Sequence, residues 1–255
     1  MNTDEIAGMP HGANPQLLLQ TVVRAMRVQE TIGAQGRPLS LAEIAAEIGV
    51  DRSAAQRIAH TLEALGYLER APGGNGFGPG RKALDRCFDY LRANPLVERS
   101  TPVLIELRKE TRERVDLSLF DGPSIIYAVR MQSKRETFFA TLIGNRMPAF
   151  NTSGGRAMLS LLNDDEIASI LARSKLLQYT PRTITDVAKI REKIERARHD
   201  GYALVQEEAL MGEIVLAAAI RDAAGRPLAA VHIAGSLSEW SEEHFRNRFA
   251  PLAME

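Results

Sequence analysis

Two short amphipathic segments joined by only about three residues place the tightest limit on how this chain can fold. The first starts at SLAE (residues 40–43), a Ser-x-x-Glu capping box before an apolar run, and Gly49 ends it. The second follows Asp51, an N-cap residue, and runs from 52 to about 65, where Gly66 supplies a left-handed end. Two helices with so short a connection predict a helix-turn-helix.

A glycine-rich segment after the second helix predicts a β-hairpin. Extended pieces at 67–70 and 76–78 flank APGGN, whose Pro, Gly and Asn are turn residues. A helix-turn-helix with a trailing hairpin is a winged helix, so we predict a winged helix-turn-helix domain at 15–79 after a disordered tail at 1–14. Pro79 lacks an N–H and is expected to loosen the second strand of the hairpin.

The remaining sequence forms one helix and then mixes helical and strand patterns. RKALDRCFDYLRAN is amphipathic and Pro95 breaks it, which predicts a linker helix at 80–95. A mixed α/β domain is expected at 96–255, so the fold class is α+β. Its expected helices are 96–111, one from 153, 164–172, 186–199 and a last helix capped by Ser241, and its expected strands are 114–120, 124–131, 137–142, 147–150, 213–222 and 227–234.

Charge and composition narrow the class of protein. The 255 residues include 32 basic and 32 acidic residues, so the net charge favours neither nucleic acid nor a membrane as partner, and only local charge is informative. A single cysteine, Cys87, excludes an internal disulfide and a cysteine-rich zinc site. The N-terminus lacks a signal-peptide pattern, and no apolar stretch approaches the ~20 residues that span a bilayer. We therefore expect a cytoplasmic protein.

The outer face of the second helix carries residue types that read DNA. Arginine pairs bidentately with guanine and glutamine with adenine in the major groove. Residues 52–82 contain five basic and two acidic residues, although the whole chain is neutral. The alternative is a small helical domain with a merely solvated polar face; the short turn, the caps and the hairpin favour DNA. The predicted DNA-contacting residues are Arg52, Ser53, Gln56, Arg57, His60, Thr61, Arg70 and Asn75.

The sequence shows no arrangement typical of a catalytic site. It contains no Gly-x-Ser-x-Gly, no phosphate-binding loop and no paired histidines at metal-ligand spacing, so we predict no catalytic residue, metal or cofactor. Cys87 falls on the apolar side of the predicted linker helix, where packing explains it better than nucleophilic chemistry. The alternative from a different class is a small-molecule enzyme that uses the helical domain for oligomerisation.

Several segments together resemble the IclR family of bacterial transcription regulators, over residues 15–252. They are LSLAEIAAEIGVDRSAAQRI in the first domain and NTSGGRAML, PRTITD and DGYALVQEEALMG in the second. The resemblance implies a winged helix, a linker helix used for dimerisation and a GAF-like domain that binds a small effector. It further implies a homodimer or homotetramer on a palindromic operator, which represses a catabolic operon or, in some members, activates it.

The resemblance also implies where the effector binds. In members that bind small keto acids, four of the lining positions tend to hold acid, thiol and hydroxyl residues, where this chain has Val205, Val215, His232 and Ala234. We therefore expect a larger and less polar ligand, such as an aromatic acid, with its carboxylate at backbone N–H groups near Ser153. His232 either orients this ligand or is a core histidine. The implied ligand-binding residues are Phe139, Met147, Ser153, Gly154, Val205, Glu213, Val215, His232 and Ala234.

Overall fold

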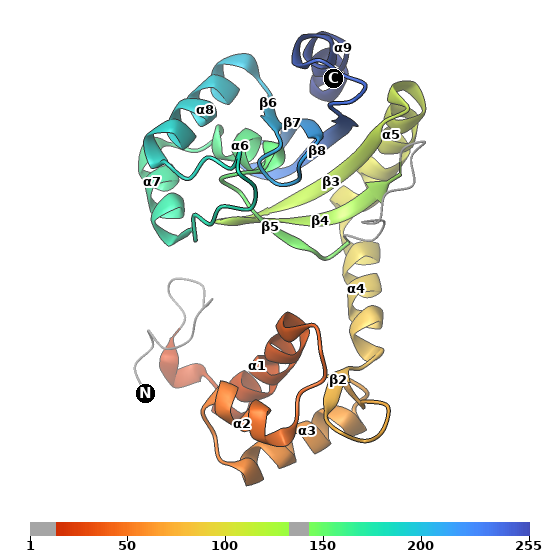
Figure 1. The fold of residues 1–255 in the computed structure, drawn as a ribbon, viewed down its shortest axis with the longest axis vertical. Helices are drawn as coiled ribbons and strands as arrows, with labels where there is room; N and C mark the ends of the chain where they lie inside the picture. The colour runs from red at the N-terminus through yellow and green to blue at the C-terminus, as the bar shows by residue number, and fades with distance from the viewer. Residues whose placement is uncertain (1–13, 133–142) are drawn as a thin grey trace. The chain divides into compact units, whose positions relative to one another are not determined.

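A computed structural model describes residues 14–132 and 143–255 of the chain, which divides into two compact units, Met1–Tyr90 and Leu91–Glu255 (Figure 1). The predicted tail apart from Asn14, the predicted strand at 137–142 and the predicted ligand residue Phe139 lie outside the described residues. The division between the units falls inside the helix predicted as a linker, and the limits 80–95 and 96–255 stay predictions.

Local capping signals set the helices of the first unit. Ser40 Oγ accepts the backbone N–H of Glu43 at 3.3 Å, and the Glu43 carboxylate accepts the N–H of Ser40 at 2.8 Å, which completes the predicted capping box. Asp51 Oδ1 accepts the N–H of Ala54 at 2.8 Å and caps the next helix. The elements are η2 (Pro15–Leu17), α1 (Gln20–Gln35), α2 (Leu41–Ile48), α3 (Arg52–Ala64), β1 (Leu68–Arg70), β2 (Phe77–Pro79) and α4 (Lys82–Ala93), the last of which crosses the division between the units.

One apolar core joins these helices to the hairpin. Val28, Ile44 and Ile58, from α1, α2 and α3, are buried together. Leu68 and Phe77 from the two hairpin strands pack into the same cluster. Burial of each such side chain contributes about 1.5–3 kcal/mol, so this core fixes α3 against α1 and α2.

The hairpin corrects the expectation about Pro79. Leu68 pairs with Pro79 at the end of the ladder, and the N–H of the next residue, Gly80, donates to Tyr67 O at 2.8 Å. The Leu68–Pro79 pair is therefore a non-hydrogen-bonded pair of the antiparallel ladder, in which the N–H groups point away from the partner strand. The missing N–H of Pro79 removes no bond, and the strand is not loosened there.

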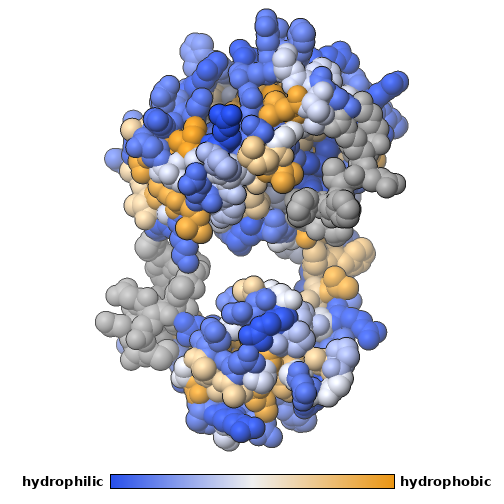
Figure 2. All heavy atoms as spheres, in the orientation of Figure 1, coloured by the Kyte–Doolittle hydropathy of each residue, from blue (hydrophilic) through white to orange (hydrophobic). Residues whose placement is uncertain are grey.

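Helix α4 exposes apolar side chains. It has no buried residue, Leu84 is 71% exposed and Phe88 is 63% exposed. Figure 2 shows hydrophobic residues gathered over this helix. The amphipathic pattern of the sequence thus produces an apolar stripe that faces solvent.

A six-stranded antiparallel sheet in the order β5-β4-β3-β8-β7-β6 organises the second unit. Its clusters place α6, α7 and α8 against one face, around Ile125 and Ile190, and α5 and α9 against the other, around Leu104 and Phe245 (Figure 1). Strand β6 is the one element of this sheet that the sequence analysis did not predict. The elements are α5 (Pro95–Thr111), β3 (Arg114–Asp121), β4 (Ser124–Met131), β5 (Arg146–Pro148), α6 (Ser153–Leu159), α7 (Asp164–Arg173), α8 (Val187–Asp200), β6 (Ala203–Gln206), β7 (Glu213–Arg221), β8 (Pro227–Ser236) and α9 (Glu242–Met254).

Two kinds of feature are absent from residues 14–132 and 143–255. None of the helices there is both long and apolar enough to cross a membrane. The same residues contain no group of three or more His, Cys, Asp or Glu side chains placed to hold a metal ion.

Candidate functional site

Helix α3 separates an apolar face from a polar one. Ala55, Ile58 and Leu62 are buried in the core of the first unit, because a helix brings every third or fourth side chain to one side. The opposite side is exposed to solvent. It carries six of the predicted DNA-contacting residues: Arg52, Ser53, Gln56, Arg57, His60 and Thr61.

The two arginines of this face are available to a ligand. Among the residues that the structure describes, none forms an ion pair or hydrogen bond with the guanidinium of Arg52 or Arg57. A guanidinium presents five N–H donors in a planar fork that matches phosphate oxygens or the O6 and N7 atoms of guanine. The polar face of α3 therefore combines exposure, positive charge and unused donors.

The other two predicted DNA-contacting residues lie on the hairpin. Arg70 Nε is 3.0 Å from Glu63 Oε1, and the Arg70 guanidinium lies 4.6 Å from the centre of the Phe77 ring. Its charge is thus balanced within the unit by a carboxylate of α3. Asn75 is exposed in the turn between the strands.

A groove beside α3 adds an arginine that the sequence analysis did not single out. The groove has a volume of about 260 Å³, and Arg24 from α1 lines it together with Arg57 and Thr61. No residue in the described part of the chain pairs with the Arg24 side chain. Arg24 was missed because it lies on a separate helix, and only the packing of α1 against α3 brings it here.

A small cavity lies where α6 begins against the sheet. Its volume is about 20 Å³, which is room for about one water molecule. Four residues predicted to bind the ligand line it: Ser153, Val205, Glu213 and Val215. We call it the effector cavity after the ligand-binding residues that the sequence predicts there; it is also lined by Tyr127, Asn151, Thr152, Glu207, Glu208, Ala209 and Leu210.

Asn151 brings an unused acceptor to the effector cavity. Its side chain is fully buried and its Nδ2 donates to Glu208 O at 3.4 Å, but Oδ1 has no hydrogen-bond partner among the described residues. A buried acceptor without a donor costs about 1–3 kcal/mol. A hydroxyl group in the cavity would satisfy it. Sequence reasoning missed Asn151 because burial decides its role, and an asparagine before a helix reads equally well as a turn residue.

His232 fills the space behind the effector cavity and does not line it. Its Nε2 is 2.7 Å from Ser118 Oγ and its Nδ1 is 3.4 Å from Ser153 Oγ. A Cβ atom added to Gly154 would lie 2.3 Å from His232 Cε1, so this ring packs directly on the start of α6. Burial lowers the pKa of His232 to about 4, and the ring is uncharged at neutral pH.

Glu213 lines the effector cavity but its charge is already engaged. Arg114 Nη1 lies 2.6 Å from Glu213 Oε1, and Arg114 Nε donates to Asp116 at 3.0 Å. Arg130 Nε donates to the other oxygen of Asp116 at 2.8 Å. Arg114 and Arg130 therefore neutralise the carboxylates of Glu213 and Asp116. Burial, together with the negative charge of Asp116, raises the pKa of the Tyr127 hydroxyl.

Two further predicted positions lie away from the cavity wall. Met147 packs against the apolar cluster under α6, α7 and α8. Ala234 is buried in β8, opposite Val215 of β7 and Arg114 of β3. Neither side chain lines the effector cavity.

The three segments of the second unit that carry the family resemblance meet in one buried network. Arg156 of NTSGGRAML forms two hydrogen bonds to the Glu208 carboxylate, at 2.6 and 2.8 Å, and a third to Phe150 O at 2.7 Å. From PRTITD, the N–H of Ile184 donates to the same carboxylate at 3.0 Å, and Thr183 Oγ1 donates to Glu208 O at 2.7 Å. This network holds the Glu207–Glu208 segment in place where both residues line the cavity.

Comparisons with known proteins bear on both units. The IclR helix-turn-helix domain model matches residues 21–72, and the bacterial transcriptional regulator IclR C-terminal model matches residues 88–254. The Pca regulon regulatory protein of Pseudomonas putida is 27% identical over 237 residues, which cover 92% of this chain and 81% of that protein.

Solved structures show the same architecture. The crystal structure of the Thermotoga maritima IclR has a TM-score of 0.67 and 25% identity, and the match covers 92% of this chain and 94% of that one. An IclR homolog of Microbacterium hydrocarbonoxydans, complexed with 4-hydroxybenzoate, has a TM-score of 0.71 and 20% identity, over 91% of this chain and 97% of that one. Since one family model alone spans more than half of the chain, the chain belongs to the IclR family of bacterial transcriptional regulators, and it is a DNA-binding regulator rather than an enzyme.

Proposed function

We propose that this regulator represses a catabolic operon, binds a palindromic operator as a homodimer or a dimer of dimers, and is released by a small apolar or aromatic organic acid. The observation that carries the ligand class is the effector cavity, which combines the apolar side chains of Val205 and Val215 with the unused acceptor of Asn151. Pockets of this kind gain affinity from apolar walls and orientation from a few polar groups.

The DNA contacts are assigned to α3. Its exposed face holds Arg52, Gln56 and Arg57, and the first two turns of such a helix meet base edges in the major groove. Arg24, which shares a groove with Arg57, is assigned to a backbone phosphate because it lies on the neighbouring helix.

The effector is assigned to the cavity at the start of α6. The backbone N–H groups there hold a carboxylate, and Asn151 Oδ1 accepts a hydroxyl of the ligand. The homolog complexed with 4-hydroxybenzoate supports an aromatic acid. A cavity of about 20 Å³ is too small for such a molecule, so binding requires a second conformation in which His232 or the Glu207–Glu208 segment moves.

Dimer formation is assigned to α4. Its exposed Leu84 and Phe88 form an apolar stripe of the kind that mediates association between copies of a chain. Two copies place two α3 helices on half-sites about 34 Å apart, and a ligand that changes this spacing weakens operator binding.

Fluorescence anisotropy tests the proposal with labelled DNA from upstream of the protein's own gene neighbourhood, at a stated salt concentration. We expect specific binding that benzoate or 4-hydroxybenzoate releases at concentrations where pyruvate and glyoxylate have no effect. Tighter DNA binding with the aromatic acid would identify an activator instead. If only the keto acids released the DNA, the proposed aromatic-acid ligand would be wrong. If the protein did not bind this DNA specifically, the operator would not lie in this upstream region.

A further inference from the structure

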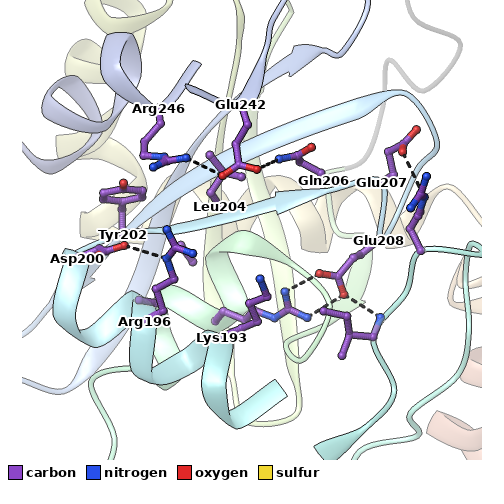
Figure 3. Close-up of a pocket in the computed structure, with 15 residues that line it drawn as sticks. Lys193, Arg196, Asp200, Tyr202, Leu204, Gln206, Glu207, Glu208, Glu242 and Arg246 are labelled. Carbon is purple, nitrogen blue, oxygen red and sulfur yellow. Dashed lines mark hydrogen bonds and ion pairs between the residues drawn. The ribbon is translucent and has the colours of Figure 1, made fainter. Parts of the chain in front are cut away.

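A second pocket lies next to the effector cavity, between α8, β6 and the start of α9, and has a volume of about 370 Å³ (Figure 3). Small-molecule sites typically enclose about 300–1,000 Å³, so this pocket is large enough for a small metabolite, unlike the effector cavity. We call it the charged pocket; Lys193, Arg196, Tyr202, Leu204, Gln206 and Arg246 define it.

The carboxylates of the charged pocket are all engaged. Each of the four lies within ion-pair distance of an arginine that lines the same pocket. The nearest distances are 2.6 Å for Glu208 and Arg156, 3.8 Å for Glu207 and Arg182, 3.4 Å for Asp200 and Arg196, and 2.7 Å for Glu242 and Arg246.

Lys193 is the one basic residue lining the charged pocket that has no ion-pair partner among the described residues. It is partly buried on α8 and lines the pocket, and none of the described residues forms an ion pair or hydrogen bond with its ammonium group. Figure 3 shows Lys193 among the arginine–carboxylate pairs, with no interaction of its own. The pocket thus carries one uncompensated positive charge in a partly enclosed space, which favours an anion.

The walls of the charged pocket offer apolar surface as well as charge, so they suit an anion that also has an apolar part. Ile184 and Leu204 line it with aliphatic surface, and Tyr202 adds an aromatic ring. We propose that the charged pocket binds a small organic carboxylate, with its carboxylate at Lys193 and its apolar body against Leu204 and Tyr202.

This site is separate from the effector cavity but shares a wall with it. Glu207 and Glu208 line both, and β6 turns Val205 towards the effector cavity while Leu204 and Gln206 line the charged pocket. Glu207 has a left-handed backbone, with φ of 57°, and the Thr180 hydroxyl donates to its carbonyl. A ligand in the charged pocket therefore lies against the Glu207–Glu208 segment, which also lines the effector cavity.

Calorimetric titration of the full-length protein with benzoate tests the proposal, with benzamide and inorganic phosphate as comparison ligands. We expect Lys193→Gln to weaken benzoate binding at this site at least tenfold. Lys189→Gln, an exposed lysine of the same helix that does not line the pocket, is the matched control and should bind within twofold of the wild type. Benzamide, which lacks the charge, should bind at least tenfold more weakly than benzoate.

Four results would overturn the proposal: no benzoate binding at millimolar concentration, unchanged binding by Lys193→Gln, equal binding of benzamide, or tighter binding of phosphate than of benzoate. Val215→Leu, which fills the effector cavity, separates this proposal from the proposed effector site. If Val215→Leu abolishes benzoate binding and Lys193→Gln does not, the carboxylate binds in the effector cavity alone.

Discussion

At the scale of single residues, replacing Arg57 is the most direct test of sequence-specific DNA binding by α3. Its guanidinium is exposed and unpaired within the described residues, so its removal breaks no ion pair or hydrogen bond inside the unit. We expect Arg57→Ala to weaken operator binding by about 1–3 kcal/mol and to relax specificity at one base pair. Anisotropy titrations across a set of single-base operator variants measure both effects.

The control for Arg57→Ala is Arg173→Ala, which removes an exposed arginine from the end of α7 in the second unit. It should leave operator affinity unchanged. A uniform loss across all operator variants would assign Arg57 to a phosphate rather than a base, and an unchanged affinity would remove it from the DNA contact.

His232 titrates at unusually low pH for a histidine. Burial lowers its pKa from 6.5 to about 4, so the unfolded chain takes up this proton first as the pH falls. The free energy of unfolding should therefore decline between pH 6.5 and about 4 through this residue. A proton NMR titration of the ring should show a midpoint near 4; a midpoint near 6.5 would contradict the buried, hydroxyl-bonded placement.

At the scale of elements, the capping box of α2 makes the helix-turn-helix sensitive to acid. Hydrogen bonds from the Ser40 backbone and side chain, with Arg37 nearby, lower the pKa of Glu43 from 4.5 to about 2. The stabilisation is complete above pH 4.5 and is lost as the pH falls towards 2. Hydrogen exchange of α2, corrected for intrinsic rates, should rise in that window, and Glu43→Gln should raise it already at pH 6.

Glu166→Gln is the matched control, because Glu166 completes a capping box on α7 in the second unit. It should raise exchange in α7 and leave α2 unchanged. Because a glutamine can still complete the capping box, equal exchange of α2 in the wild type and in Glu43→Gln at pH 6 would show that the charge of Glu43 contributes nothing measurable.

Elements with local signals could be predicted from the sequence, and features made by distant packing could not. The caps at Ser40 and Asp51 and the left-handed Gly66 are short-range signals, and the structure confirms all three. Strand β6 has four residues without alternating polarity, so nothing marks it before it pairs with β7. The His232 ring of β8 packs on Gly154 of α6, a contact between distant parts of the chain that no local pattern reports.

At the scale of the whole molecule, the apolar stripe of α4 bears on assembly. If α4 forms the proposed dimer interface, Phe88→Ser should shift the protein from dimer towards monomer in sedimentation velocity, because each Å² of apolar surface buried on association contributes about 25 cal/mol of free energy. Leu177→Ser, which replaces a 58% exposed leucine of the second unit, is the control. Phe88→Ser should also bind a half-site as the wild type does while losing affinity for the full palindrome. An unchanged dimer would place the interface elsewhere.

The alternation along β6 has an evolutionary consequence. Because Val205 contributes to one chamber and Leu204 and Gln206 to the other, adjacent codons determine the walls of two separate chambers. Substitutions of Val205 change one chamber and substitutions of Leu204 or Gln206 change the other, while the Arg156–Glu208 pair keeps the partition between the chambers in place. If both proposed sites bind ligands, descendants of this regulator can change what one chamber recognises without losing what the other recognises.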